Sequence, residues 1–196
     1  MRVCGLALVA LGIGGATVAG VDTNKAIGTP TAPITIEIFS DFECPSCKTF
    51  HETTLPQLVR EYVIPGKVFV ASFEFPLPAH PHSREAAGYA VAASRVGMYM
   101  PVADALFRGQ QSWSVSGRVW ETVAGVLTPA QQKRVQALAK DPGVLAEIEN
   151  EIGMGRRIPL TETPTLVVIR GTRRIPITGR LIRYELLKQL IDDLSK

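Results

Sequence analysis

Cysteine, histidine and charge of one sign are all scarce in this sequence. It has three cysteines and three histidines among 196 residues, and its formal net charge is only +3. A structural zinc site needs four Cys or His ligands at regular spacings, and the chain has neither a second Cys pair nor a spaced His pair. Basic residues are scattered and do not interleave with aromatic residues, unlike those of a nucleic-acid-binding protein. We therefore expect no bound metal and no nucleic-acid partner.

Apolar residues, by contrast, are plentiful. They make up 46% of the chain and charged residues 20%, as in packed globular proteins, and the length suits one domain of ordinary size. Such a chain can bury a core without disulfide staples.

The first 20 residues differ from the rest. Arg2 precedes an apolar run over residues 3–21 that contains many small residues, which is typical of a secretory signal peptide cleaved after Ala19. The run is also nearly as long as the roughly 20 residues that cross a bilayer, so an uncleaved anchor is the alternative. In both cases we expect the rest of the chain to be exported, to the periplasm or the extracytoplasmic face of a membrane. Cys4 lies inside this segment, which leaves two cysteines in the exported part.

The next part of the chain changes its pattern three times. Residues 21–32, rich in Thr, Gly and Pro, indicate a linker. Strand patterns follow at 34–39 and 67–75. Between them an amphipathic helix is expected from Pro45 onward, with a kink at Pro56.

From about 77 to 160 the sequence carries helix signals and no strand signals. The expected helices cover residues 83–96, 100–108, 118–127, 129–140 and 142–154. The last two begin with a first-turn proline that follows a capping residue, Thr128 or Asp141. Strand character returns at 165–170, an edge strand is expected at 173–178 because Pro176 cannot donate a hydrogen bond, and an amphipathic helix follows. The order predicts an α/β domain over 33–196, with a parallel strand–helix–strand start, a helical insert and an antiparallel pair.

Cys44 and Cys47 stand where the first strand gives way to the first helix. A thiol attacks a disulfide only as the thiolate, so a redox site needs one cysteine of lowered pKa and a second within reach. At a helix N-cap the unpaired N–H groups and the positive end of the dipole favour a negative Cys44 sulfur. Pro45 suits the first helical position because it has no N–H to leave unpaired. The alternative is a passive structural disulfide, whose very short loop would constrain the unfolded chain little.

Several segments together resemble the DsbA-like proteins of the thioredoxin-fold superfamily. They are Phe39–His51 around the motif Cys44-Pro45-Ser46-Cys47, Phe75-Pro76-Leu77 with His80 and the Ala-rich helix, and Thr163-Pro164-Thr165 at a strand entry. The resemblance extends from about Thr31 to the C-terminus. It implies a thioredoxin fold with a helical insertion between the second strand and the strand that follows a cis-proline.

The resemblance also implies roles for four residues. Cys44 is the expected attacking cysteine and Cys47 the resolving one. Pro164 is expected to be cis and to face them, and the backbone of Thr163 would pair with an extended substrate segment. The redox-active disulfide Cys44–Cys47 would serve without a separate cofactor. The expected partners are protein or peptide thiols and disulfides and a membrane redox protein.

The sequence departs from this family at one position. Such proteins often bury an acid beneath the dithiol, where this chain has Ile38. Glu37 is adjacent and is a possible modulator. The two-residue period of a strand directs it to the opposite face, to a solvated or paired position, so it would replace the missing acid only if the strand carried a bulge or if it acted from elsewhere. As possible modulators, Glu43 would oppose a thiolate and Ser46 offers only a neutral hydroxyl. We therefore expect a Cys44 pKa below the free value of about 8.5 but above the value of about 3.5 in DsbA, and a milder oxidant.

The histidines and tryptophans receive simpler interpretations. His51 lies one helical turn beyond the motif and invites a general-base role, although packing is the plainer reading. His80 and His82, between prolines, are interpreted as loop or helix-entry residues. Trp113 and Trp120 are interpreted as core of the insert, although one of them could line a substrate groove.

Redox direction is not fixed by these patterns. Isomerases of this superfamily tend to carry a long N-terminal dimerisation domain, and residues 20–32 are too few for one. This favours a monomeric oxidase over a reductase or isomerase. A different class stays open: an exported binding or chaperone-like domain with a passive disulfide.

Overall fold

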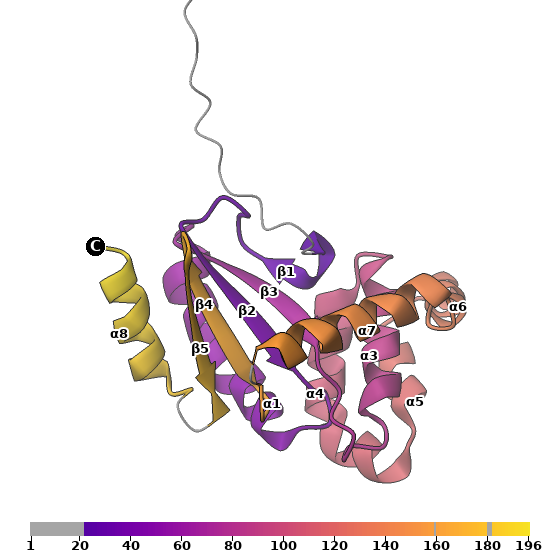
Figure 1. Cartoon of the computed structure of the whole chain (residues 1–196). Helices are drawn as coiled ribbons and strands as arrows, with labels where there is room; N and C mark the ends of the chain where they lie inside the picture. The colour runs from indigo at the N-terminus through magenta and orange to yellow at the C-terminus, as the bar shows by residue number, and fades with distance from the viewer. Residues whose placement is uncertain (1–21, 159, 180–181) are drawn as a thin grey trace, which may run out of the picture.

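The computed structural model describes residues 22–158, 160–179 and 182–196 (Figure 1). The expected signal peptide or anchor and its cleavage point lie outside the described residues. Within the described part of the chain, no helix is long and apolar enough to cross a membrane.

The centre of the molecule is one sheet of five strands in the order β1-β3-β2-β4-β5. The strands are β1 (Ala26–Ile27), β2 (Ile34–Ser40), β3 (Val68–Glu74), β4 (Thr165–Arg170) and β5 (Arg173–Thr178). The β2 and β3 strands are parallel, and the other three pairings are antiparallel. A parallel pair needs a helical crossover, which the segment after the cysteines supplies. The predicted order of elements from β2 onward and the thioredoxin fold are confirmed, whereas β1 was not predicted.

That crossover is helical from Pro45 to Val63 but not uniform. It consists of α1 (Pro45–Thr49), a π-helical turn η2 (Phe50–Thr54), α2 (Leu55–Leu58) and a second π turn η3 (Val59–Val63). The first π turn ends just before Pro56, where a proline ring clashes with the carbonyl of a regular α-turn and its missing N–H breaks the ladder. The irregularity expected at Pro56 is therefore a widened turn, and the helix continues through it.

In the described residues the insert forms five helices, and α8 follows the last strand. They are α3 (Ser83–Ser94), α4 (Tyr99–Ser116), α5 (Val119–Ala124), α6 (Pro129–Leu138), α7 (Pro142–Arg157) and α8 (Tyr184–Leu194). Thr128 and Asp141 cap α6 and α7 as their sequence signals indicate, each followed by a first-turn proline. The α4 helix runs well past its predicted end at 108 and stops only at Gly117, which has φ 71°. Its last turns are poor in apolar residues, which is why periodicity did not reveal them.

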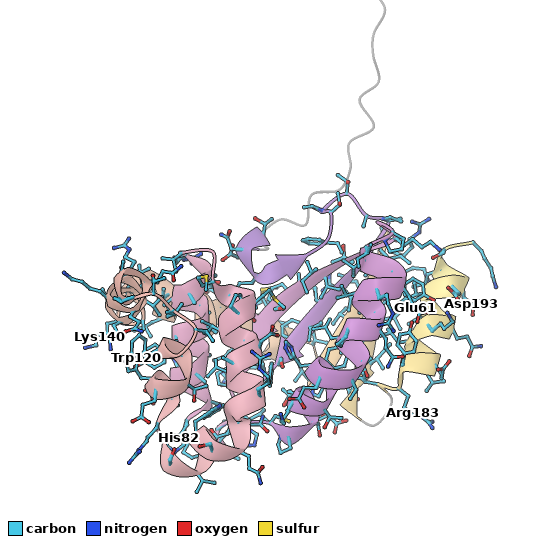
Figure 2. The ribbon with its side chains drawn as sticks, turned by 180° about the vertical axis from the view of Figure 1, so that it is seen from behind. Glu61, His82, Trp120, Lys140, Arg183 and Asp193 are labelled. Atoms are coloured by element: carbon cyan, nitrogen blue, oxygen red, sulfur yellow. The ribbon has the colours of Figure 1, made fainter. Side chains whose placement is uncertain are left out.

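The two faces of the sheet are covered differently (Figure 1). The crossover helices and α8 bury one apolar cluster against β2, β3 and β4, while α3 and α7 bury a second on the opposite face. The insert has a third core of its own, to which both Cys44 and Cys47 belong. In the reverse view of Figure 2, Trp120 lies within the insert and Glu61 lies near α8. The cysteine pair therefore sits where the sheet meets the insert.

The linker prediction for 21–32 is wrong for its described part. The segment forms a 3₁₀ turn η1 (Thr23–Lys25) and then β1, an edge strand that pairs with β3. A two-residue strand has no readable period, so composition alone suggested a loop.

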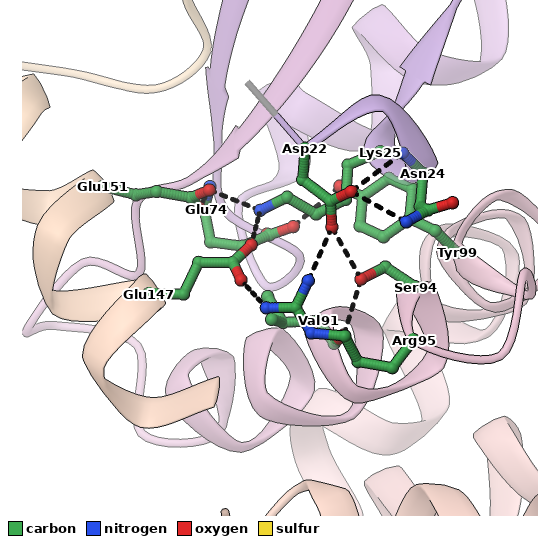
Figure 3. A network of polar contacts seen from close by, with 10 residues as sticks. All are labelled: Asp22, Asn24, Lys25, Glu74, Val91, Ser94, Arg95, Tyr99, Glu147 and Glu151. Atoms are coloured by element: carbon green, nitrogen blue, oxygen red, sulfur yellow. Dashed lines mark hydrogen bonds and ion pairs between the residues drawn. The ribbon is translucent and has the colours of Figure 1, made fainter. Parts of the chain in front are cut away.

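A buried charge cluster holds this segment in place (Figure 3). Lys25 is 1% exposed, and its Nζ lies 2.5 Å from Glu151 and 3.0 Å from Glu147, both on α7. Glu74, at the end of β3, accepts a hydrogen bond of 2.7 Å from the Tyr99 hydroxyl. Burial raises the pKa of Glu74 to about 8, although the positive charge of Lys25 opposes this shift. The cluster ties the N-terminal segment, the sheet and the insert together.

Candidate active site

The local geometry places the two cysteines at the start of a helix. The β2 strand ends at Ser40, and Cys44 takes the N-cap position of α1 with extended backbone angles, φ −76° and ψ 121°. Pro45 follows in the first turn, as the sequence indicates. Both thiols are free in this structure. Cys47 lies inside the protein and is 0% exposed, whereas Cys44 is 7% exposed.

A loop from the far end of the insert lies over Cys44. The Cys44 thiol lies 3.4 Å from the carbonyl oxygen of Thr163. The Thr163–Pro164 peptide bond is cis. The prediction that Pro164 is cis is therefore confirmed, and the backbone of Thr163, remote in sequence, lies against the Cys44 sulfur.

The two thiols have opposite electrostatic environments. A hydrogen bond from the Cys47 thiol lowers the pKa of Cys44 to about 5, the Thr163 side chain and the backbone N–H groups of Ser46 and Cys47 act in the same direction, and burial opposes them. Burial raises the pKa of Cys47 well above its ordinary range, and its proximity to Cys44 adds to the increase. At neutral pH the dithiol therefore holds one thiolate, on Cys44.

Asp41 is the residue that the sequence analysis missed. Its backbone N–H donates to the Cys47 sulfur at 3.4 Å, and its carbonyl accepts from the Cys44 N–H at 3.1 Å. Its carboxylate, fully buried, accepts from the N–H groups of Glu43 and Leu77 and lies against His80 Nδ1, each at 2.7 Å. The short bond to Glu43 is an Asx turn, which the position of Asp41 just after a strand could have indicated.

The other predicted modulators of the motif separate into exposed and anchored residues. Pro45 and Ser46 are exposed beside the thiols. Glu43 is 9% exposed, and its carboxylate accepts a hydrogen bond of 2.8 Å from the N–H of His82. This bond holds the carboxylate of Glu43 to the loop before α3.

Glu37 is directed away from the dithiol. It is 3% exposed and pairs with Arg174 on β5 at 2.6 Å, on the face of the sheet opposite to Ile38. Burial raises its pKa, and Arg174 opposes the increase. The paired position expected from strand periodicity is confirmed, and the idea that Glu37 replaces the missing buried acid is wrong, because the strand has no bulge to turn it.

The histidines His51 and His80 contact different parts of the structure. His51 Nε2 lies 2.6 Å from Asp104, and its ring lies 4.6 Å from that of Phe107, so it packs against α4. His80, interpreted from sequence as a simple loop or helix-entry residue, instead belongs to the site through Asp41. The signal that could have found it is its place just after the strand parallel to β2, since parallel strands end at the same edge of a sheet.

The insert contributes a second unexpected residue, Gln110 on α4. Its side-chain amide donates to the carbonyls of Phe42 at 2.6 Å and Cys44 at 3.0 Å. Trp113, one turn further along, is 1% exposed and is core, as expected. Trp120 is half-buried and its ring lies 5.1 Å from that of Tyr89, remote from the cysteines in the contacts it makes.

Comparison with known proteins gives the family. A family model described as thioredoxin matches residues 21–193. This chain belongs to that family. A segment of 54 residues is 41% identical to the "Probable disulfide bond formation protein D" of Bacillus cereus, and it covers 28% of this chain and 25% of that relative. The chain thus spans only about a quarter of that relative.

Two further similarities extend over most of the chain. The disulfide bond formation protein D of Bacillus subtilis is 23% identical over 154 residues, covering 74% of this chain and 67% of the relative. The solved structure of Wolbachia pipientis alpha-DsbA1 superposes with a TM-score of 0.71 at 20% identity, over 87% of this chain and 89% of that one. At 20% identity, the similarity to alpha-DsbA1 concerns the fold. This fold is the DsbA-like form of the thioredoxin fold, with a helical insert.

Proposed function

We propose that this protein is an exported thiol–disulfide oxidoreductase that oxidises protein thiols. The observation that carries the proposal is the asymmetry of the dithiol: a low-pKa Cys44 at a helix N-terminus and a buried, high-pKa Cys47 behind it. The names of the curated relatives, which refer to disulfide bond formation, agree with it.

The reaction begins with the Cys44–Cys47 disulfide. A substrate thiolate attacks the Cys44 sulfur, the disulfide bond breaks, and Cys47 leaves as a thiolate and takes up a proton. A second substrate thiolate then attacks the substrate sulfur of the mixed disulfide, and Cys44 leaves with the electron pair. The substrate loses two electrons and gains a disulfide, and the protein ends as the dithiol.

The low pKa of Cys44 favours the oxidising direction. Stabilising the thiolate stabilises the reduced protein, and a more stable reduced form makes the disulfide a stronger oxidant. With a pKa of about 5, Cys44 lies above the value of about 3.5 in DsbA, so we expect a milder oxidant. A membrane redox protein would reoxidise the dithiol, and the protein would act as a monomer in the periplasm or on the extracytoplasmic face.

Substrate binding is assigned to the loop over Cys44. Thr163 lies beside the reacting sulfur, so a substrate segment lying extended along its backbone would bring a cysteine to Cys44. The first attack requires no separate acid or base. The Cys47 thiolate that leaves can take up the proton that the substrate thiol has lost, or one from water.

Removal of Cys44 tests the proposal. The variant Cys44→Ser should lose both insulin reduction and the oxidative refolding of a reduced, unfolded protein, whereas Cys47→Ser should accumulate mixed disulfides with substrates. If Cys44→Ser keeps its activity in refolding assays, the protein acts as a binding or chaperone-like domain and the enzymatic proposal fails.

A further inference from the structure

The His80 side chain joins the cysteine pair through Asp41. Its Nδ1 lies 2.7 Å from Asp41 Oδ2, in the loop between β3 and α3. Asp41 in turn contacts both cysteines through its backbone, at the Cys47 sulfur and the Cys44 N–H. A fully buried carboxylate with an imidazole beside it is favourable when the imidazole is protonated, because an unpaired buried charge is costly.

The charges around His80 favour its cationic form. Partial burial lowers the pKa of His80, but the hydrogen bond and charge of Asp41, together with the charges of Cys44 and Glu43, outweigh it and raise the pKa above its ordinary value of 6.5. The interaction between His80 and Cys44 is reciprocal: a thiolate that stabilises the imidazolium is itself stabilised by it.

The side of His80 that faces α3 and α7 carries further charges. A surface groove of about 560 Å³ runs past His80, and its charged lining residues are Arg84, Glu149 and Arg156. Arg84 forms an ion pair with Glu149. Arg156 is then the additional charge on that side. Its positive charge opposes protonation of His80, but only weakly, because solvent in the open groove screens the interaction.

We propose that His80, held by Asp41 beside the cysteine pair, is a positioning residue whose positive charge stabilises the Cys44 thiolate and thereby sets the oxidising strength of the dithiol. This inference rests on the proposed function for its biological meaning, but the charge interaction itself does not depend on any protein substrate.

The effect enters at the second step of exchange. When the second substrate thiolate attacks the mixed disulfide, the electron pair of the breaking bond stays on the Cys44 sulfur. The imidazolium stabilises this charge without transferring its proton. The proton released by the second substrate thiol goes to solvent, so the balance of the reaction is unchanged.

The motif itself cannot provide this charge. Ser46 is neutral, and Glu43 would repel a thiolate. Lys48, also on α1, is paired with Glu52 and donates to the carbonyl of Phe107. We therefore assign the positive group to another element, the loop after β3, which the chain brings to the same edge of the sheet as the cysteines.

The chain contains a matched control. His51 also pairs with an aspartate, Asp104, at 2.6 Å, but it faces α4 and packs on Phe107. The variants His80→Gln and His51→Gln therefore remove the same type of side chain from the same type of pair.

The experiment compares four proteins: wild type, His80→Gln, His80→Lys and His51→Gln. For each, the Cys44 pKa is measured by thiolate absorbance, and the dithiol–disulfide equilibrium is measured against glutathione from pH 5 to 9. We expect His80→Gln to shift the equilibrium about tenfold away from the reduced form at pH 6, which corresponds to about 30 mV, and to raise the Cys44 pKa. His51→Gln should change neither quantity.

The pH profile separates charge from packing. In the wild type, the pKa of His80 should be lower in the oxidised protein than in the reduced protein, because only the reduced protein carries the thiolate. At a pH between these two values, His80 takes up part of a proton when the dithiol is reduced. His80→Gln should lose this inflection. His80→Lys should also lose it but keep the wild-type equilibrium at pH 6, because its charge is retained.

Two results would overturn the inference. One is a Cys44 pKa and an equilibrium constant in His80→Gln equal to those of the wild type. The other is an equal effect of His80→Lys and His80→Gln, which would show that packing and not charge is responsible. Failure of the proposed function looks different: if the wild type oxidises no protein thiols while His80→Gln still shifts the Cys44 pKa and the glutathione equilibrium, the function is wrong and the charge interaction stands.

Discussion

The Cys44 sulfur lies 3.4 Å from the carbonyl oxygen of Thr163, a residue 119 positions away in the sequence. This contact joins the start of the active-site helix to the loop that precedes β4. It places the low-pKa sulfur under the backbone that we assign to substrate binding.

The Thr163 side chain should tune the Cys44 sulfur. Because it lowers the pKa of Cys44, the variant Thr163→Val should raise that pKa above about 5, and it should make the disulfide a weaker oxidant. Thiolate absorbance titration measures the change. Thr53→Val, which removes a hydroxyl bonded only within its own helix, serves as the control and should leave the pKa unaltered.

Folding stability of the reduced protein should depend on pH through Cys44. Its pKa of about 5 in the folded state lies below the ordinary value of about 8.5, so the thiolate stabilises the folded form fully above the unfolded pKa, and this contribution is lost as the pH falls through about 5. Urea unfolding of the reduced wild type and of Cys44→Ser at pH 4 and pH 8 tests this. The wild type should gain stability over the variant at the higher pH, and a constant difference between them would count against it.

The buried Lys25 should be essential to stability. Lys25→Met leaves the carboxylates of Glu147 and Glu151 without their buried partner, which typically costs about 3–5 kcal/mol of unfolding free energy. Denaturant unfolding provides the measurement. The exposed Lys133→Met should change stability little, and a similarly small effect at Lys25 would contradict the role of the cluster.

The α4 helix should stabilise the active-site segment through Gln110. Gln110→Ala leaves the carbonyls of Phe42 and Cys44 without their donor, at a cost of about 1–3 kcal/mol. Its exposed neighbour gives the control, Gln111→Ala, which should be close to neutral. Equal midpoints of denaturant unfolding for the two variants would show that the insert does not support the site in this way.

Features with a repeating pattern were predictable from the sequence. The two-residue period of β2 correctly directed Glu37 away from the face of Ile38, and the proline after a cap residue correctly marked the starts of α6 and α7. The position of the cysteine pair at a helix start was predictable because a strand pattern precedes it and a helical period follows it.

Features that depend on distant partners were not predictable. Lys25 lies in a segment with the composition of a loop, and only carboxylates of α7 make its burial possible. Asp41 and His80 each look ordinary in sequence and acquire a role only where β2 and β3 end together. Gln110 lies in the part of α4 that has no apolar stripe.

The central claim is that Cys44 is the reactive thiolate and Cys47 the buried thiol behind it. The most direct test is alkylation of the reduced protein with iodoacetamide at pH 6, with the labelled cysteine located by mass spectrometry. The account predicts that Cys44 is modified while Cys47 stays unmodified, because the pKa of Cys44 is about 5 and that of Cys47 is raised well above its ordinary range. Equal labelling of the two cysteines, or faster labelling of Cys47, would contradict it.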